Sequence, residues 1–249
     1  MTGFKDHFSG HAAAYATHRP TYPAVLADWL AEQAPARGTA LDCGCGNGQL
    51  SILLADRFDH VVATDASAQQ IASAVVHPRV DYRVAPAEAS GLPDASVDLI
   101  TVAQAAHWFD LNTFYAEVRR VARPGAVLAL ITYVNVITDP EISAIIDHFY
   151  GPVLDDYWQP ERRHVEAGYQ DFAFPFAEFD APELAIELEW NLAGLIGYIE
   201  SWSATKAFER AGHGDRIEQF RRDVAAAWGD PNRTRHMHWP LLMRVGRLA

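Results

Sequence analysis

The sequence predicts a doubly wound α/β fold, in which helices cover both faces of a mostly parallel sheet. Short apolar runs alternate with helical patterns between residues 40 and 133, as is typical of parallel strands buried on both faces. The first run passes directly into Gly44-Cys45-Gly46-Asn47-Gly48, a glycine-rich strand-to-helix turn. The second run ends on an acidic residue, Asp65. Together these features place a ligand site at the carboxyl ends of the first strands.

The elements follow from the same alternation. We predict strands at Ala40–Cys43, His60–Thr64, Val80–Ala85, Val97–Ala103 and Ala126–Tyr133. Helical patterns cover Gly48–Arg57, Ala68–Val75 and Asp110–Val121, and the last has an aspartate at its N-cap. The alternation stops after Thr138, and residues 138–182 hold aromatic-rich helical patterns that predict a lid inserted after strand 5. A strand at Leu184–Trp190, helices at Ala193–Ser203 and Asp215–Trp228, and a last strand at Met237–Val245 complete the prediction.

Composition narrows the classes of function. The chain has 249 residues, 49% apolar and 21% charged, which suits one soluble domain spanning residues 1–249. A net charge of −12 would repel a phosphate backbone, so we expect no nucleic-acid partner. Met1–Gly10 is polar, and no run approaches the ~20 apolar residues that cross a bilayer. We therefore expect a cytoplasmic protein that does not span a membrane, as a monomer or a homodimer.

The glycine turn predicts an adenosine-like ligand. Glycine tolerates positive φ and lets a ligand lie against bare backbone. The spacing is G-x-G-x-G, and Gln49 stands at the position where a dinucleotide fingerprint, G-x-G-x-x-G, needs its third glycine. No Lys-Ser/Thr pair follows, which removes the P-loop interpretation. Asp65, 19 residues beyond Gly46, can accept hydrogen bonds from both ribose hydroxyls. Its alternative role is to cap the helix that begins near Ser67.

Several motifs resemble those of the class I S-adenosylmethionine-dependent methyltransferases. They are D-C-G-C-G-N-G from Asp42, V-V-A-T-D ending at Asp65, V-A-P-A-E from Val84, L-P at Leu92, S-V-D-L-I from Ser96, Q-A-A-H-W-F from Gln104, and Leu128–Tyr133. The resemblance implies a Rossmann-like sheet of seven strands, mostly parallel, with an antiparallel last strand and a helical lid after strand 5. It implies S-adenosyl-L-methionine as cofactor and a small molecule as methyl acceptor.

Further segments are similar to the small-molecule branch related to trans-aconitate methyltransferase. They are Phe8, Tyr15-Ala16, Arg19-Pro20 and Tyr22-Pro23 near the N-terminus, then Tyr157-Trp158, Arg162, Tyr169 and Ser201-Trp202-Ser203. This branch implies carboxylate O-methylation of small acids in some members.

Cofactor roles are carried over by position. In the family, the glycines support the methionine part of the cofactor and the acid before them faces its ammonium. The acid after strand 2 takes the ribose hydroxyls, the next residues line the adenine, the end of strand 4 lies beneath the sulfonium, and N-terminal helices, here within residues 1–38, close over the cofactor. The implied cofactor-binding residues are Tyr15, Arg19, Asp42, Gly44, Gly46, Asp65, Ala66, Ala87, Glu88, Gln104 and Ala105.

The acceptor side is less defined. His107 follows strand 4 beside Trp108 and could orient or deprotonate the nucleophile, since an unperturbed imidazole titrates near neutral pH. It could equally cap the next helix or pack under the lid. A carboxylate is already ionised at pH 7 and needs little base. The candidate substrate-binding residues are Trp108, Trp158, Arg162 and Tyr169, with Tyr150 and Arg163 as further lid candidates. Their alternatives are core packing for the aromatics and solvated charges for the arginines.

Two other features carry weaker interpretations. Cys43 and Cys45 are too close for an unstrained disulfide and lack a second pair for zinc, which indicates two small buried thiols. His236 and His238 point the same way from a strand, but no third ligand is near in the sequence, so we expect no metal site.

Besides a methyltransferase, two alternatives remain. One is a non-catalytic cofactor-binding or protein-interaction module on the same fold. The other is an NAD-dependent oxidoreductase, which would need the missing glycine spacing. Fold alone does not decide between them.

Overall fold

The computed structural model describes residues 20–249, so Tyr15 and Arg19 lie outside the described residues. Its centre is a sheet with the order β3-β2-β1-β4-β5-β8-β6, and β7 pairs with β8. The strands are β1 (Thr39–Cys43), β2 (His60–Asp65), β3 (Val80–Val84), β4 (Val97–Ala103), β5 (Ala122–Tyr133), β6 (Ala177–Phe179), β7 (Ala185–Trp190) and β8 (Arg235–Arg247). β1 to β5 pair in parallel, whereas β8 is antiparallel to β5, β6 and β7. The mostly parallel sheet with an antiparallel last strand is confirmed.

Helices lie on both faces of this sheet because successive side chains of a strand alternate between faces. Val127, Ala129 and Ile131 of β5 join one core cluster, and Leu128 and Leu130 join the other. The first face carries α2 (Ala24–Gln33) and α3 (Gln49–Ala55), and the second carries α5 (Leu111–Val121) and α7 (Arg162–Glu166). α4 (Ala68–Ala72) packs beside β2 and β3. Asp110 caps α5 as predicted, accepting from the backbone N–H groups of Asn112 and Thr113.

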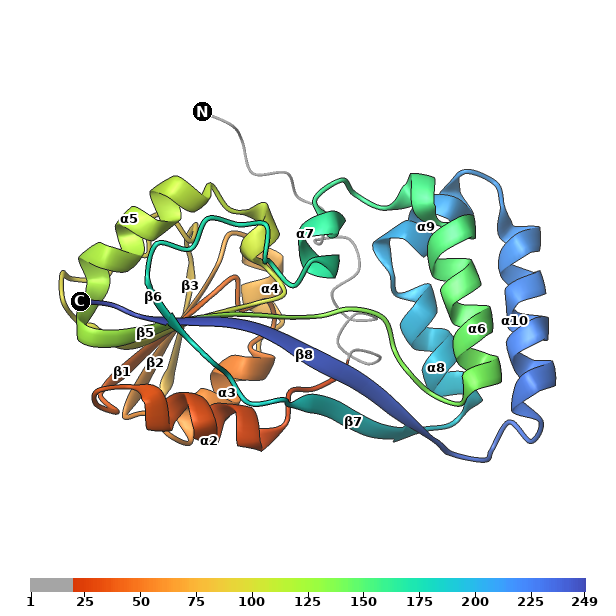
Figure 1. The fold of residues 1–249 in the computed structure, drawn as a ribbon, viewed down its shortest axis with the longest axis horizontal. Helices are drawn as coiled ribbons and strands as arrows, with labels where there is room; N and C mark the ends of the chain where they lie inside the picture. The colour runs from red at the N-terminus through yellow and green to blue at the C-terminus, as the bar shows by residue number, and fades with distance from the viewer. Residues whose placement is uncertain (1–19) are drawn as a thin grey trace.

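Four of the helices that follow β5 gather at one end of the molecule (Figure 1). They are α6 (Pro140–His148), α8 (Leu192–Glu200), α9 (Ser203–Arg210) and α10 (Gly214–Trp228), which we call the helical layer. Between α6 and α7 lie a π-helical turn at Phe149–Val153 and a 3-10 turn at Asp155–Tyr157. Figure 1 shows α7 between the helical layer and the sheet. The helical layer is therefore built from sequence before β7 (α6) and after β7 (α8, α9 and α10).

Two elements differ from the prediction. The sheet has eight strands in the described residues, one more than the seven predicted. The additional strand, β6, has three residues and pairs only with β8, so it is too short to show a period in the sequence. α9 was also not predicted, although its apolar residues Ala204 and Phe208 are buried.

Candidate active site

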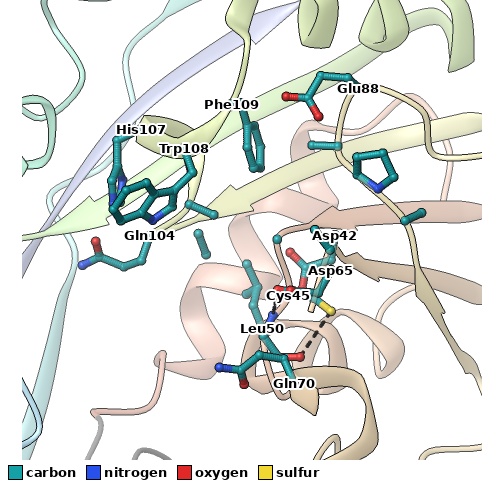
Figure 2. Close-up of a pocket in the computed structure, with 18 of the residues that line it drawn as sticks. Asp42, Cys45, Leu50, Asp65, Gln70, Glu88, Gln104, His107, Trp108 and Phe109 are labelled. Atoms are coloured by element: carbon teal, nitrogen blue, oxygen red, sulfur yellow. Dashed lines mark hydrogen bonds between the residues drawn. The ribbon is translucent and has the colours of Figure 1, made fainter. Parts of the chain in front are cut away.

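A cavity of about 910 Å³ opens at the carboxyl ends of β1, β2 and β4 (Figure 2). The chain passes from β1 outward to β2 and β3, and then returns to place β4 on the other side of β1. Ligands of open α/β sheets bind at such a switch point. Eleven of the predicted site residues line this cavity: Asp42, Gly44, Gly46, Asp65, Ala66, Ala87, Glu88, Gln104, Ala105, His107 and Trp108.

The glycine turn forms the floor of the cavity with left-handed backbone. The φ angles of Gly44, Gly46 and Gly48 are +65°, +57° and +88°, values that glycine adopts without a Cβ penalty. Two of these glycines also have no room for a side chain. A Cβ on Gly44 would lie 2.5 Å from the Cβ of Ala105, and one on Gly48 would lie 2.1 Å from the hydroxyl of Tyr82. The turn therefore depends on glycine at both positions.

Asp42 is a buried carboxylate at the edge of this turn, with 1% exposure. Ser51 Oγ donates to one oxygen at 2.6 Å, and Thr101 Oγ1 donates to the other at 2.8 Å. Burial raises the pKa of Asp42 to about 6 despite these hydrogen bonds, because removal from water disfavours the charged form. A cation entering the cavity would compensate this cost.

Asp65 joins the glycine turn to the start of α4. Its two carboxylate oxygens accept from the N–H of Gly46 at 2.9 Å and of Ser67 at 2.8 Å. Ser67, not Asp65, caps α4, since its hydroxyl accepts from the N–H of Gln70. Burial raises the pKa of the Asp65 carboxyl. A carboxylate has about four lone-pair sites, so Asp65 can still accept from hydroxyls of a ligand.

His107 and Gln104 lie together at the other end of the cavity, away from Asp42 and Asp65 (Figure 2). His107 lies in a 3-10 turn, Ala106–Trp108, directly after β4. Burial, together with smaller contributions from the charges of Arg162 and His164, lowers the pKa of its imidazole to about 3. His107 is therefore neutral at physiological pH.

Trp158, Arg162 and Tyr169 do not line this cavity. Tyr169 is fully buried, and its hydroxyl lies 3.1 Å from Nδ1 of His107. The guanidinium of Arg162 lies over the rings of Trp158 and Tyr150, 5.1 and 5.5 Å from their centroids. Its Nε donates to the Tyr150 hydroxyl, and it forms no salt bridge with a carboxylate of the described residues. Arg163 is exposed.

Residues that the sequence did not single out complete the lining. Tyr133 ends β5 at the same edge of the sheet as the glycine turn, so its position could have been inferred from the parallel register. Tyr22, which belongs to one of the N-terminal segments named in the resemblance but had no role assigned, also lines the cavity. Gln70 and Glu161 line it as well, but no local pattern marks them, because tertiary packing brings them there. Among residues 20–249, no lysine or arginine lines the cavity. Five carboxylates do: Asp42, Asp65, Glu88, Asp110 and Glu161.

This fold and cavity define a doubly wound α/β protein with a ligand site at its switch point. Residues 41–130 match the family described as "Methyltransferase domain". A protein of Dictyostelium discoideum named as a methyltransferase is 34% identical over 231 residues, covering 91% of this chain and 88% of that protein. A solved structure described as a type II methyltransferase from Anaeromyxobacter dehalogenans is 51% identical, with a TM-score of 0.88, covering 92% of this chain and 97% of that one.

The chain belongs to the class I S-adenosylmethionine-dependent methyltransferases. A malonyl-[acyl-carrier protein] O-methyltransferase of Enterobacter lignolyticus is 38% identical over 127 residues, covering 49% of this chain and 51% of that protein. Within residues 20–249 no helix has the length and apolar character needed to cross a membrane.

Proposed function

We propose that this chain binds S-adenosyl-L-methionine in the cavity and transfers its methyl group to a small molecule. The observation that carries the proposal is the buried carboxylate of Asp42, which opens onto a cavity with no lysine or arginine in its described lining. A ligand with an ammonium group would supply the missing positive charge. The bare backbone of Gly44 and Gly46 and the second acid, Asp65, suit the remainder of such a ligand.

The bound cofactor would supply an electrophilic methyl group, and the protein's own contribution is positioning and exclusion of water. Asp42 would hold the ammonium, and Asp65 the ribose hydroxyls. Small residues, Ala66, Ala85 and Ala87, leave room for a flat adenine ring. Gln104 and His107 lie at the acceptor end, where Trp108, Tyr22 and Tyr133 add aromatic surface. No described group there needs to take up a proton if the acceptor is already ionised.

Calorimetry with S-adenosyl-L-methionine tests the cofactor assignment. We expect saturable binding of S-adenosyl-L-methionine and none of NAD, because the turn lacks the dinucleotide glycine spacing. Absence of binding would end the cofactor assignment. Binding without methyl transfer to any member of a panel of small acids, alcohols and amines would instead favour a non-catalytic module.

For the acceptor we propose carboxylate O-methylation of a small organic acid. The match to a malonyl-[acyl-carrier protein] O-methyltransferase supports this chemistry. Arg162 adds a physical reason, because its guanidinium has no salt-bridge partner in the described residues and the neighbouring Glu161 lines the cavity. Arginine recognises carboxylates through two parallel hydrogen bonds.

A second candidate acceptor is an uncharged molecule with a hydroxyl or amine nucleophile. The five carboxylates and the absence of a described cation in the lining favour it, since this field opposes the entry of an anion. The acceptor panel separates the two candidates.

Replacing Arg162 with alanine should raise the KM for an anionic acceptor about tenfold or more, because a charge-assisted hydrogen bond contributes about 1.5–3 kcal/mol. The KM for S-adenosyl-L-methionine should stay the same. Arg163→Ala is the matched control. Arg163 is the exposed neighbour of Arg162, so its replacement should leave both KM values unchanged. Steady-state methyl transfer to an acid acceptor measures both variants. Unchanged turnover of the acid by Arg162→Ala would remove Arg162 from acceptor binding.

A further inference from the structure

A chain of hydrogen bonds runs from the end of β5 to His107. Gln104 Nε2 lies 2.8 Å from the carbonyl oxygen of Tyr133, and Gln104 Oε1 lies 2.9 Å from Thr132 Oγ1. The Tyr169 hydroxyl also interacts with the Thr132 side chain and with the backbone N–H of Ala106, and it lies 3.1 Å from His107 Nδ1. The side chains of Thr132 and Tyr169 are completely buried. The four side chains thus form one connected network behind the acceptor end of the cavity.

The donor and the acceptor of each hydrogen bond in this network can be assigned by starting from the backbone carbonyl of Tyr133. A backbone carbonyl only accepts, so the Gln104 amide nitrogen must face Tyr133 and its oxygen must face Thr132. The Thr132 hydroxyl therefore donates to Gln104 and must accept from Tyr169, because it has one proton. The Tyr169 proton is then already used. It follows that Nδ1 of His107 carries the proton and donates to the Tyr169 oxygen.

Backbone conformation shows that this arrangement is imposed by the fold. Only three non-glycine residues of the described chain have positive φ, and two of them, Gln104 at +58° and Tyr169 at +60°, belong to the network. Each such residue costs of order 1–3 kcal/mol and persists only where surrounding structure determines it. Strained backbone of this kind clusters at functional sites.

We propose that Gln104, Thr132 and Tyr169 are positioning residues that fix His107 as its Nδ1–H tautomer, so that Nε2 presents a lone pair to the methyl acceptor. His107 lines the cavity, and no hydrogen bond joins its Nε2 to the described residues. The consequence for the acceptor rests on the proposed function. Nε2 matches a hydroxyl or N–H group beside the reacting atom, and it repels a bare carboxylate oxygen. An acid acceptor would therefore carry a hydrogen-bond donor next to its carboxylate.

The tautomer can be measured by NMR on the full chain without any ligand. Protein labelled with ¹⁵N-histidine gives separate shifts for Nδ1 and Nε2, and His107→Gln identifies the His107 signals by their loss. We expect a protonated Nδ1 and an unprotonated Nε2 that stay unchanged between pH 5 and 8, because His107 is held neutral. A protonated Nε2, or titration of His107 within this range, would overturn the proposal.

Variants test the network itself. Thr132→Val removes the acceptor for the Tyr169 proton, so that proton turns to Nδ1 and His107 changes to the Nε2–H tautomer. Thr132→Ser keeps a hydroxyl and should restore the original tautomer. Tyr169→Phe removes the hydroxyl that accepts from Nδ1 of His107, so His107 should no longer be held as the Nδ1–H tautomer. Tyr115→Phe is the matched control, because the buried Tyr115 hydroxyl has no hydrogen-bond partner among residues 20–249 and its removal should leave His107 unchanged.

Kinetics with an acceptor from the panel supply a second readout. Thr132→Val should raise the KM for a hydroxyl or amine acceptor about tenfold, because the acceptor loses its hydrogen bond to Nε2 of His107. The affinity for S-adenosyl-L-methionine should be retained. If Thr132→Val leaves the tautomer unchanged, the positioning role is wrong. If the NMR results hold but no methyl transfer occurs, the network stands and the proposed function fails.

Discussion

Gly48→Ala is expected to lower the free energy of unfolding by about 3 kcal/mol. Left-handed backbone costs an alanine roughly 1–2 kcal/mol, and Gly48 has a φ of +88°. The added methyl would also lie 2.1 Å from the hydroxyl and 2.8 Å from the ring of Tyr82. Overpacking of this kind costs about 1–3 kcal/mol. For a chain of this length the sum corresponds to a fall in Tm of about 6–12 °C, measured by thermal unfolding.

Two other glycines separate backbone strain from contact. Gly91 has a φ of +72°, and a Cβ there would have no atom of the described residues within 4 Å, so Gly91→Ala should show strain alone, about 1–2 kcal/mol. Gly46 has a φ of +57°, and its nearest neighbour is Gln70 Oε1 at 3.9 Å. Gly46→Ala should therefore be destabilised like Gly91→Ala, but its methyl would occupy the cavity and weaken binding of S-adenosyl-L-methionine.

The comparison of Gly48→Ala with Gly91→Ala has one outcome that would contradict the predicted contact with Tyr82. Equal destabilisation of Gly48→Ala and Gly91→Ala would show that the turn does not pack on Tyr82 as described. A Tyr82→Phe background supplies the internal check, because loss of the hydroxyl should return part of the stability lost in Gly48→Ala. Non-additivity of the two changes measures the contact directly.

The parts of the molecule that the sequence predicted well are those with local causes. Four of the five parallel strands, β1, β2, β4 and β5, appear as apolar runs because most of their residues are buried, whereas β3, at the edge of the sheet, is only partly buried. Asp110 marks the start of α5 because an N-cap has its own residue preference. Asp42, the glycine turn and Asp65 are also local, since each directly ends or follows a strand. The cofactor end of the cavity could therefore be proposed from the sequence.

The acceptor end could not be derived in the same way. His107, Tyr133 and Glu161 come from separate segments, and their meeting depends on how β5 and α7 pack. The prediction placed Tyr169 among substrate-binding residues, whereas the structure places it behind His107, where it touches the network and not the cavity. An aromatic at helical spacing has the same pattern whether it faces a pocket or the core. Long-range packing decides this difference, and it is not written in any short motif.

Asp42→Asn is expected to change stability and cofactor binding in opposite directions. The pKa of Asp42 is about 6 in the folded protein and about 3.9 for an unfolded chain. The native state therefore holds the proton more tightly, and wild-type stability falls by about 3 kcal/mol as the pH rises from about 4 to above 6. Asparagine has no such charge. Without ligand, thermal unfolding at pH 7.5 should show Asp42→Asn at least as stable as the wild type, and the two should converge near pH 4.

Binding of S-adenosyl-L-methionine should show the reverse. Removing one partner of a buried, hydrogen-bonded charge pair costs 2–5 kcal/mol, so Asp42→Asn should weaken affinity about 100-fold. Wild-type affinity should rise with pH up to about 6 and then level off, because the ammonium requires ionised Asp42. Binding at pH 6 should release about half a proton, seen by calorimetry in buffers of different ionisation enthalpy. Asp65, whose pKa is also raised, remains in both proteins, so the difference between them isolates Asp42.

Asp98→Asn is the matched control for this pair of effects. Asp98 is also fully buried, but it accepts from the N–H groups of Gly38 and Thr39 and pairs with Arg123, outside the cavity. Its replacement should lower stability, because it removes a hydrogen-bonded ion pair, and it should leave cofactor affinity unchanged in the folded fraction. Retained affinity in Asp42→Asn, with the proton release still present, would show that the ammonium binds elsewhere. We expect Asp42→Asn to lose cofactor affinity without losing stability, and Asp98→Asn to lose stability without losing cofactor affinity. This pair of results would show that the buried acid at Asp42 serves ligand binding and the one at Asp98 serves the stability of the fold.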